Sequence, residues 1–215
     1  MYQARKFFDQ EFFHVFNRSI AHFKILNNSI NALRFIETLD YYNEKNLGEK
    51  FSQVKKRKKY FYNNLLLPKE SSLIKIISYC IMPDHYHLLI KILEEKYFSK
   101  YINNIENSFT RYFNIKSNRK GPLWEANFKA VKIMSDKQLL HVSRYIHLNP
   151  TTSSLVEKPE NWKFSSYKDI ICNKILLKEI LTEISIDNPS RYKKFVENNI
   201  DYQKKLKLIK NLMHD

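Results

Sequence analysis

Two histidines separated by one residue lie inside an apolar run, IMPDHYHLLI, at residues 81–90. Side chains at positions i and i+2 of a β-strand point to the same face, so a strand here places the imidazoles of His85 and His87 side by side. Two such imidazoles can bind one divalent ion and leave room for a phosphate oxygen. The pattern also arises by chance, and taken alone it is explained more often by histidines that only satisfy hydrogen bonds.

A second group of residues follows in DKQLLHVSRYIHLN, at residues 136–149, which has the spacing of a helix. Tyr145 and Asn149 are four positions apart and share one face of that helix, with His141 one turn earlier. A tyrosine hydroxyl can attack a phosphodiester, but its pKa of about 10 means that it needs an activating group such as a metal ion. Because the chain has 14 tyrosines, a core aromatic is the ordinary alternative for Tyr145.

The remaining elements must bring these two groups together. Aromatic-rich and alternating runs predict strands at 11–20, 71–82, 85–92 and 127–134. Apolar spacing of three to four residues predicts helices at 28–45, 94–116 and 136–149. Pro83-Asp84 predicts a tight turn in a hairpin, Ser135 a helix N-cap, and Pro150 a helix end. The order predicts an α+β fold, an antiparallel sheet with helices packed on one face.

The chain of 215 residues has 37 Lys and Arg against 22 Asp and Glu, a net charge of +15 and an isoelectric point near 9.6. This balance favours a polyanionic partner, with nucleic acid first and an anionic membrane surface second. Enrichment in Lys, Ile and Asn is also typical of an AT-rich genome, which would account for part of the charge. The only two glycines, Gly48 and Gly121, exclude P-loop and dinucleotide-binding loops, which need several glycines close together.

Two basic stretches are candidate nucleic-acid surfaces. KKRKKYFY (55–62) combines cations that can neutralise phosphates with aromatics that can stack on bases, and RYFNIKSNRKGPLW (111–124) is a second basic segment. A solvated charge run with its aromatics in the core is an equal alternative for the first stretch. The candidate DNA-binding residues are Lys55, Lys56, Arg57, Lys58, Lys59, Arg119, Lys120 and Lys129.

The sequence predicts a soluble cytoplasmic protein. No apolar run approaches the roughly 18 residues of a membrane-spanning helix, and charges interrupt residues 1–17 before a signal-peptide core can form. Cys80 and Cys172 have no metal-binding spacing and fit a reducing compartment.

The motifs resemble those of one enzyme family. IMPDHYHLLI is similar to the HUH (His-hydrophobic-His) motif of single-tyrosine transposases, and RYIHLNP (144–150) resembles the tyrosine-bearing helix of REP-associated tyrosine transposases. Three further segments resemble that family in the same order, namely FHVFNR (13–18), GPLWEANFKAVKI (121–133) and WKFSSY (162–167). Each piece is short, but all five occur in register.

The resemblance implies a ferredoxin-like sheet (the HUH endonuclease fold) in which His85 and His87 bind Mg²⁺ or Mn²⁺. It implies that Tyr145 attacks single-stranded or hairpin DNA, forms a 5′-phosphotyrosine link and releases a 3′-OH, and that strand transfer reverses this step. Asn149 matches the position of a further polar metal ligand in related enzymes. The implied protein is bacterial and its partner is DNA, with a homodimer and a monomer equally open.

Some features differ from the family pattern. Asp84 replaces the Asn that is common before the first histidine, and its carboxylate could tune His85 or repel phosphate. TTSSLVEKP (151–159) lacks the Arg-Ala-Gly that often follows Asn-Pro. We expect a catalytic domain over residues 1–170 and a basic helical extension over 171–215, outside the resemblance.

Other functions remain open. A non-catalytic binder of single-stranded or hairpin nucleic acid, built on the same scaffold, would need neither the metal ion nor the tyrosine. A replication-initiator or relaxase nuclease would use similar chemistry, but such enzymes usually carry a helicase or a longer partner segment that this sequence does not show. Membrane-surface binding is the least favoured, since no basic helix has a strong apolar face.

Overall fold

The computed structural model describes residues 6–57, 60, 62, 64–172, 180, 182–186 and 188–212, with side chains described as far as residue 207. Its centre is a sheet with the strand order β2-β3-β1-β4, in which neighbouring strands are antiparallel. The strands are β1 (Phe12–Arg18), β2 (Ile74–Ile81), β3 (His85–Ile92) and β4 (Lys129–Lys132). The predicted α+β class with an antiparallel sheet is therefore confirmed, as is the hairpin that joins β2 to β3.

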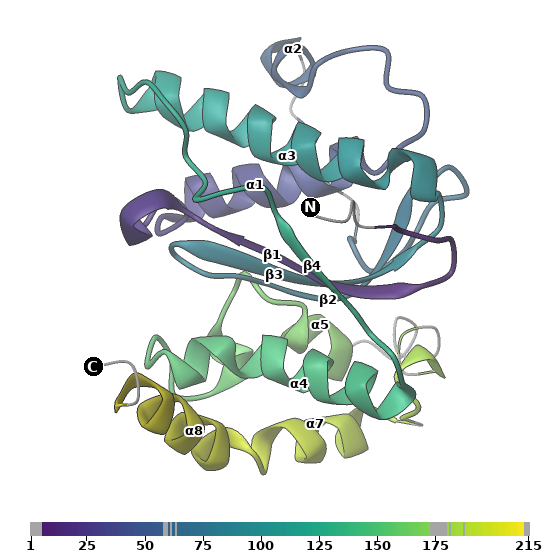
Figure 1. Ribbon diagram of the computed structural model, residues 1–215, viewed down its shortest axis with the longest axis vertical. Coiled ribbons are helices and arrows are strands. Elements are labelled where there is room, and N and C mark those ends of the chain that lie inside the picture. Colours follow the sequence, from purple (N-terminus) through teal and green to yellow (C-terminus); the bar gives the residue numbers. More distant parts are fainter. Residues whose placement is uncertain are drawn as a thin grey trace.

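Helices cover both faces of the sheet (Figure 1). One layer holds α1 (Ser29–Tyr42), α2 (Phe51–Arg57) and α3 (Glu95–Lys116). The other layer holds α4 (Asp136–Thr152), α5 (Tyr167–Cys172), α7 (Pro189–Glu197) and α8 (Ile200–Leu212), while short 3-10 turns lie at Ile20–His22 and Pro159–Asn161. The expectation that helices pack on one face only was wrong, because it described the layer of α1 and α3 but not the second layer.

Strand β2 explains why the second layer is needed. Every residue of β2 except Lys75 is buried, so both faces of this strand must be covered. Helix α4 packs on β2 and on β3. At the other edge of the sheet, three of the four residues of β4 are exposed. The sheet face beside α4 is therefore closed over β2 and accessible near β1 and β4.

The two faces of the central strands have different chemistry. On one face, the ring of Tyr86 on β3 packs 5.0 Å from Phe35 of α1, inside the apolar core. On the other face, the ring of His87 lies 5.6 Å from Tyr145 of α4. Because neighbouring positions of a strand alternate between faces, Tyr86 and His87 serve two different layers.

Helix α4 begins as the sequence predicted but ends later. The side chain of Ser135 accepts a hydrogen bond from the backbone amide three residues on and caps the helix. The prediction that Pro150 ends the helix was wrong, since α4 continues to Thr152. Pro150 lies in the last turn, and the amide of Ser153 still bonds to the carbonyl of Asn149, so the missing proline N–H does not stop the helix.

The C-terminal helices fix the position of α4. His147 of α4 is fully buried, and its Nδ1 and Nε2 lie 2.7 Å from the hydroxyl of Tyr192 and 2.8 Å from that of Ser166. The Tyr192 hydroxyl also donates to Ser143 at 3.0 Å. Helices α7 and α8, which belong to the predicted extension, thus pack directly on α4. None of the described helices combines the length and apolarity needed to cross a membrane.

Candidate active site

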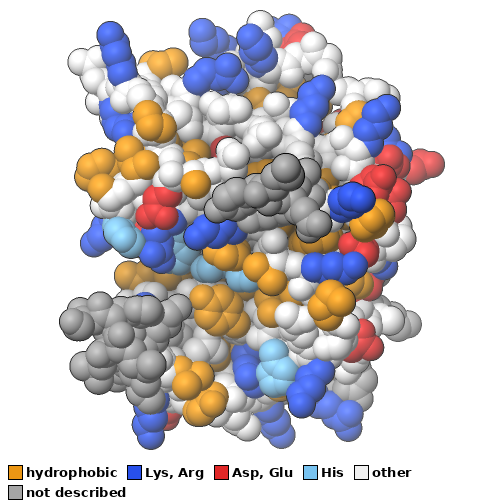
Figure 2. Space-filling model, in the orientation of Figure 1, with side chains coloured by type: hydrophobic (Ala, Val, Ile, Leu, Met, Phe, Trp, Pro, Cys, Tyr) orange, Lys and Arg blue, Asp and Glu red, His pale blue; other side chains and the backbone are white. Residues whose placement is uncertain are grey.

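Strand pairing gathers polar side chains on the sheet face beside α4. His85 and His87 lie on this face of β3, opposite Arg18 and Phe16 of β1. Lys129 of β4 is the second partner of Phe16 and so shares the same face. Figure 2 shows histidine side chains, in pale blue, in a row between the two layers, with Lys and Arg side chains beside them. Positive charge therefore lies beside the imidazoles on this side of the sheet.

The two histidines of the His-x-His pair are close enough to bind one ion. Their ring centres are 5.0 Å apart and their planes are inclined at 87°. Bonds from imidazole nitrogen to a metal are about 2 Å long, so one ion can lie between two rings at this separation. Burial, and then the positive charges nearby, lower the pKa of His87 well below its ordinary value. His87 is therefore a neutral imidazole at pH 7, as a metal ligand must be.

Asp84 holds His85 from the turn that precedes β3. Its Oδ1 lies 2.6 Å from Nδ1 of His85, and its Oδ2 lies 3.6 Å from Nε of Arg18 and 3.4 Å from Nδ1 of His22. Burial alone would raise the pKa of the Asp84 carboxyl, but the hydrogen bonds to His85 and His22 and the positive charge of Arg18 lower it to about 2. Asp84 is thus an ionised carboxylate that accepts hydrogen bonds.

A third imidazole, that of His14 on β1, completes the group. Its Nε2 lies 2.9 Å from Nδ1 of His87, and the two rings are stacked with centres 5.1 Å apart. Burial lowers the pKa of His14 to about 4. Two neutral imidazoles can share one hydrogen bond, in which one ring donates and the other accepts.

Helix α4 brings Tyr145 to the imidazoles within the same chain. The phenol ring lies edge-on to His87 at 5.6 Å and to His14 at 6.0 Å between ring centres. The side chain of Tyr145 is 43% exposed, so one side contacts the histidines and another faces solvent. Tyr145 and His87, which are about sixty positions apart in the sequence, are therefore neighbours in the fold.

Asn149 lies one turn after Tyr145 and is buried. Its Nδ2 donates to the carbonyl of Tyr145 at 3.1 Å, which leaves its Oδ1 as the atom that could bind a metal ion. His141, predicted to share this face, bonds instead with Arg144 at 2.9 Å and packs on Phe195 of α7. His141 therefore contacts α7 and does not join the imidazoles of the site.

The donor set fits a transition-metal ion better than Mg²⁺. Imidazole nitrogens are softer donors than carboxylates, and Mg²⁺ prefers oxygen ligands in a regular octahedron. Of the two predicted ions, Mn²⁺ is therefore the better match to His85 and His87. In the described part of the chain, no three His, Cys, Asp or Glu side chains form a metal-binding group.

The predicted DNA-binding residues lie in several places. Lys55, Lys56 and Arg57 belong to α2, in the layer on the opposite side of the sheet from α4 (Figure 1). Lys55 is paired with Glu37, and Arg57 with Glu49.

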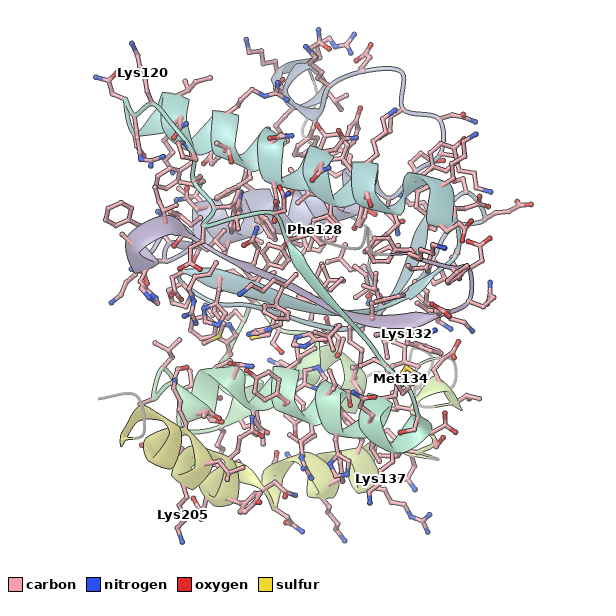
Figure 3. All side chains as sticks on the ribbon, in the orientation of Figure 1. Lys120, Phe128, Lys132, Met134, Lys137 and Lys205 are labelled. Atoms are coloured by element: carbon pink, nitrogen blue, oxygen red, sulfur yellow. The ribbon has the colours of Figure 1, made fainter. Side chains whose placement is uncertain are left out.

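The other predicted DNA-binding residues also lie in different parts of the molecule. Arg119 and Lys120 follow α3, and Figure 3 shows Lys120 at the end of the layer away from α4. Lys58 and Lys59 lie outside the described residues. Of the described members of this set, Lys129 is the one that shares the sheet face with His85 and His87.

Sequence reasoning missed three residues of the site, His14, Arg18 and Lys207. The first two had a usable signal, because FHVFNR alternates and puts His14, Phe16 and Arg18 on one face of a strand. Lys207 of α8 donates to the Ser153 hydroxyl at 2.9 Å. Burial lowers the pKa of Lys207. The positive charge of Arg18 lowers it further, and the carboxylate of Asp84 acts in the opposite direction. No pattern in the sequence indicates this position for Lys207.

Comparisons with known proteins match the segment that contains His85, His87 and Tyr145. The family model described as "Transposase IS200 like" matches residues 51–149. A Haemophilus influenzae protein whose name places it among the REP-associated tyrosine transposases is 30% identical over an alignment of 101 positions, which covers 42% of this chain. The chain spans 57% of the length of that relative.

One solved structure shares the fold. It is a REP-associated tyrosine transposase bound to a REP hairpin, and it matches with a TM-score of 0.57 and 16% sequence identity. The match covers 80% of this chain and 87% of the other. It extends the likeness well beyond the segment that the family model matches.

Proposed function

Because residues 51–149 match the family model described as "Transposase IS200 like", we propose that this protein is a metal-dependent transposase that cleaves and joins single-stranded or hairpin DNA through Tyr145. The observation that carries the proposal is the position of the Tyr145 ring, 5.6 Å from that of His87 in the same chain. The proposed nucleophile is thus close to one of the two candidate metal ligands, and its ring is partly exposed.

The chemistry is a transesterification at phosphorus. The Tyr145 oxygen attacks a backbone phosphate and loses its proton to water, the bond from phosphorus to the 3′ oxygen breaks, and that oxygen takes up a proton. The 5′-phosphotyrosine link conserves the bond energy, so a 3′-OH can later attack it and release Tyr145 without ATP. When bound, a divalent ion would polarise the phosphate and so offset the weak nucleophile.

Individual residues have distinct roles in this mechanism. His85 and His87 would bind the ion, with Asn149 as a further ligand through its amide oxygen. Arg18, Lys129 and Lys207 would bind phosphates next to the one that reacts, because they supply positive charge on or near the sheet face. The open side of that face, near β1 and β4, would admit a single strand.

DNA hairpins are the favoured substrate class for two reasons. The chain carries a net charge of +15, which suits a polyanion. A solved structure that shares its fold is that of a REP-associated tyrosine transposase bound to a REP hairpin.

A covalent-capture experiment tests the proposal. The protein is incubated with a labelled pool of single-stranded hairpins with randomised flanks and Mn²⁺, then denatured and separated on a gel. We expect a labelled protein band with wild-type protein, its loss with EDTA, and its loss in Tyr145→Phe. Tyr97→Phe, on α3 in the opposite layer, is the matched control and should keep the band.

The outcomes separate the alternatives. Mass spectrometry of the adduct should place the nucleotide on Tyr145. An adduct that survives in Tyr145→Phe would refute the assigned nucleophile. Hairpin binding without any adduct, and unchanged by EDTA, would instead support the non-catalytic binder.

A further inference from the structure

We infer that His14 and Asp84 are positioning residues, which hold His87 and His85 in the tautomer whose Nε2 is free to bind the metal ion. The inference rests on the proposed function, because it concerns the same metal site. It assigns a role to a histidine on β1, outside residues 51–149, and to the carboxylate that precedes the His-x-His pair.

Asp84 determines the tautomer of His85. A carboxylate only accepts hydrogen bonds, so the 2.6 Å contact between its Oδ1 and Nδ1 of His85 requires a proton on Nδ1. In a neutral ring the lone pair then lies on Nε2. Metal-binding histidines usually donate their second N–H to a carboxylate in this way, which orients the ring and increases the basicity of the ligand nitrogen.

His14 is the hydrogen-bond partner of His87, as Asp84 is of His85. Its Nε2 is 2.9 Å from Nδ1 of His87, so that nitrogen of His87 is engaged in a hydrogen bond and Nε2 is the atom left for a metal ion. His87 can bind an ion through Nε2 only if its Nδ1 donates and His14 accepts. The required arrangement is therefore a proton on Nδ1 of His87 and a lone pair on Nε2 of His14.

The fold holds both partners rigidly. The His14 ring packs against Phe16, with 4.8 Å between ring centres, and is enclosed by His87 and Tyr145. The backbone carbonyl of Asp84 accepts from the amide of Ser19 at 2.8 Å, while its carboxylate also faces Arg18. Neither partner has to move to make its hydrogen bond, so the two imidazoles are pre-oriented before an ion binds.

Matched substitutions test the two roles separately. His14→Phe keeps a ring of similar size but removes the acceptor, whereas His14→Gln provides an amide oxygen that can accept in its place. Asp84→Ala removes the acceptor for His85, whereas Asp84→Asn keeps an amide oxygen. Circular dichroism and urea unfolding midpoints confirm that each variant is folded.

Two measurements report on the site without requiring DNA cleavage. Titration calorimetry with Mn²⁺ should show about 10- to 100-fold weaker binding in His14→Phe and Asp84→Ala, and substantial recovery in His14→Gln and Asp84→Asn. Long-range ¹H–¹⁵N spectra of the metal-free wild type, at a pH where the rings are neutral, should show Nδ1–H tautomers for His85 and His87. In His14→Phe, the His87 signals should shift toward a mixture of tautomers.

Failure of this inference differs from failure of the proposed function. If wild-type protein binds Mn²⁺ and His14→Phe and Asp84→Ala bind it equally well, the positioning roles are refuted while the metal site stands. An Nε2–H tautomer of His87 in wild-type protein would also refute the role of His14. If wild-type protein and His87→Ala bind Mn²⁺ alike, the His pair is not the metal site and the proposed function fails.

Discussion

Burial determines what each histidine of this protein can do. His14 and His87 are largely shielded from solvent beside an accessible phenol, so they remain neutral and available as acceptors or ligands. His147 is also shielded, but both of its nitrogens are engaged with Tyr192 and Ser166, and it joins α4 to its neighbours. The same side chain is therefore a candidate ligand at one position and a packing group at another.

We expect His147 to make the protein less stable in acid. Burial lowers its pKa from 6.5 to about 3 in the folded state. Below pH 6.5 the unfolded chain binds a proton that the folded chain does not, so the free energy of unfolding should fall as the pH decreases toward 3. This one group contributes up to about 1.4 kcal/mol per pH unit.

Urea unfolding between pH 7 and pH 4 measures this slope. His147→Gln keeps hydrogen-bonding groups but cannot titrate, so its stability should depend less on pH than that of the wild type, whatever its absolute value. Equal slopes in the two proteins would show that His147 does not remain neutral in the folded state.

Among the elements, helix α4 makes two different sets of contacts. One side of the helix presents Tyr145 to the imidazoles, and another is held by α5 and α7 through His147, Ser143 and Tyr192. The position of the proposed nucleophile therefore depends on helices that contain none of the proposed catalytic groups. The chain from 189 onward contributes to the site by holding α4 and by supplying Lys207.

Tyr192→Phe should destabilise the protein by about 1–3 kcal/mol, because it leaves His147 Nδ1 and the Ser143 hydroxyl buried without their shared partner. Equilibrium urea unfolding at pH 7 gives the change. Tyr202→Phe, on an exposed position of α8, is the matched control and should stay within about 0.5 kcal/mol of the wild type. A loss of similar size in both variants would contradict the role of the buried network.

Across the whole molecule, positive charge is divided between two surfaces. One lies on the sheet face beside α4 and includes Arg18 and Lys129, with Lys207 of α8 bonded to Ser153 just after α4. The other lies on α2, where Lys55 and Arg57 are already paired with carboxylates of the same chain. Ion pairing within the protein reduces the charge that is available to a phosphate. Arg18 is also paired, with Asp84, so we expect Lys129 and Lys207 to contribute more to DNA binding than the cations of α2.

Salt dependence of hairpin binding decides between the two surfaces. Each phosphate contact contributes roughly 0.7–0.9 to the slope of log K against log salt, so Lys129→Ala combined with Lys207→Ala should lower that slope by about 1.5. Lys56→Ala combined with Arg57→Ala removes the same charge from α2 and should change it much less.

Fluorescence anisotropy with a labelled hairpin across a NaCl series gives both slopes. A larger decrease of the salt slope in the α2 variant would show that the surface predicted from KKRKK is the principal binding surface.

Local patterns in the sequence predicted most of the elements and part of the site. Alternation placed His85 and His87 on one face, helical spacing placed Tyr145 and Asn149 on α4, and Ser135 marked where that helix starts. The order of elements predicted the antiparallel sheet. These features depend on neighbours in the chain, which is why they can be read from it.

Contacts between distant segments were decided by the tertiary structure. His14 and His87 are 73 residues apart, and only the pairing of β1 with β3 makes one the hydrogen-bond partner of the other. The second helical layer, the course of α4 past Pro150 and the approach of Lys207 likewise depend on packing. The sequence alone determined which groups could act chemically, whereas the tertiary structure decided which of them meet, because their meeting depends on burying apolar surface that lies far apart along the chain.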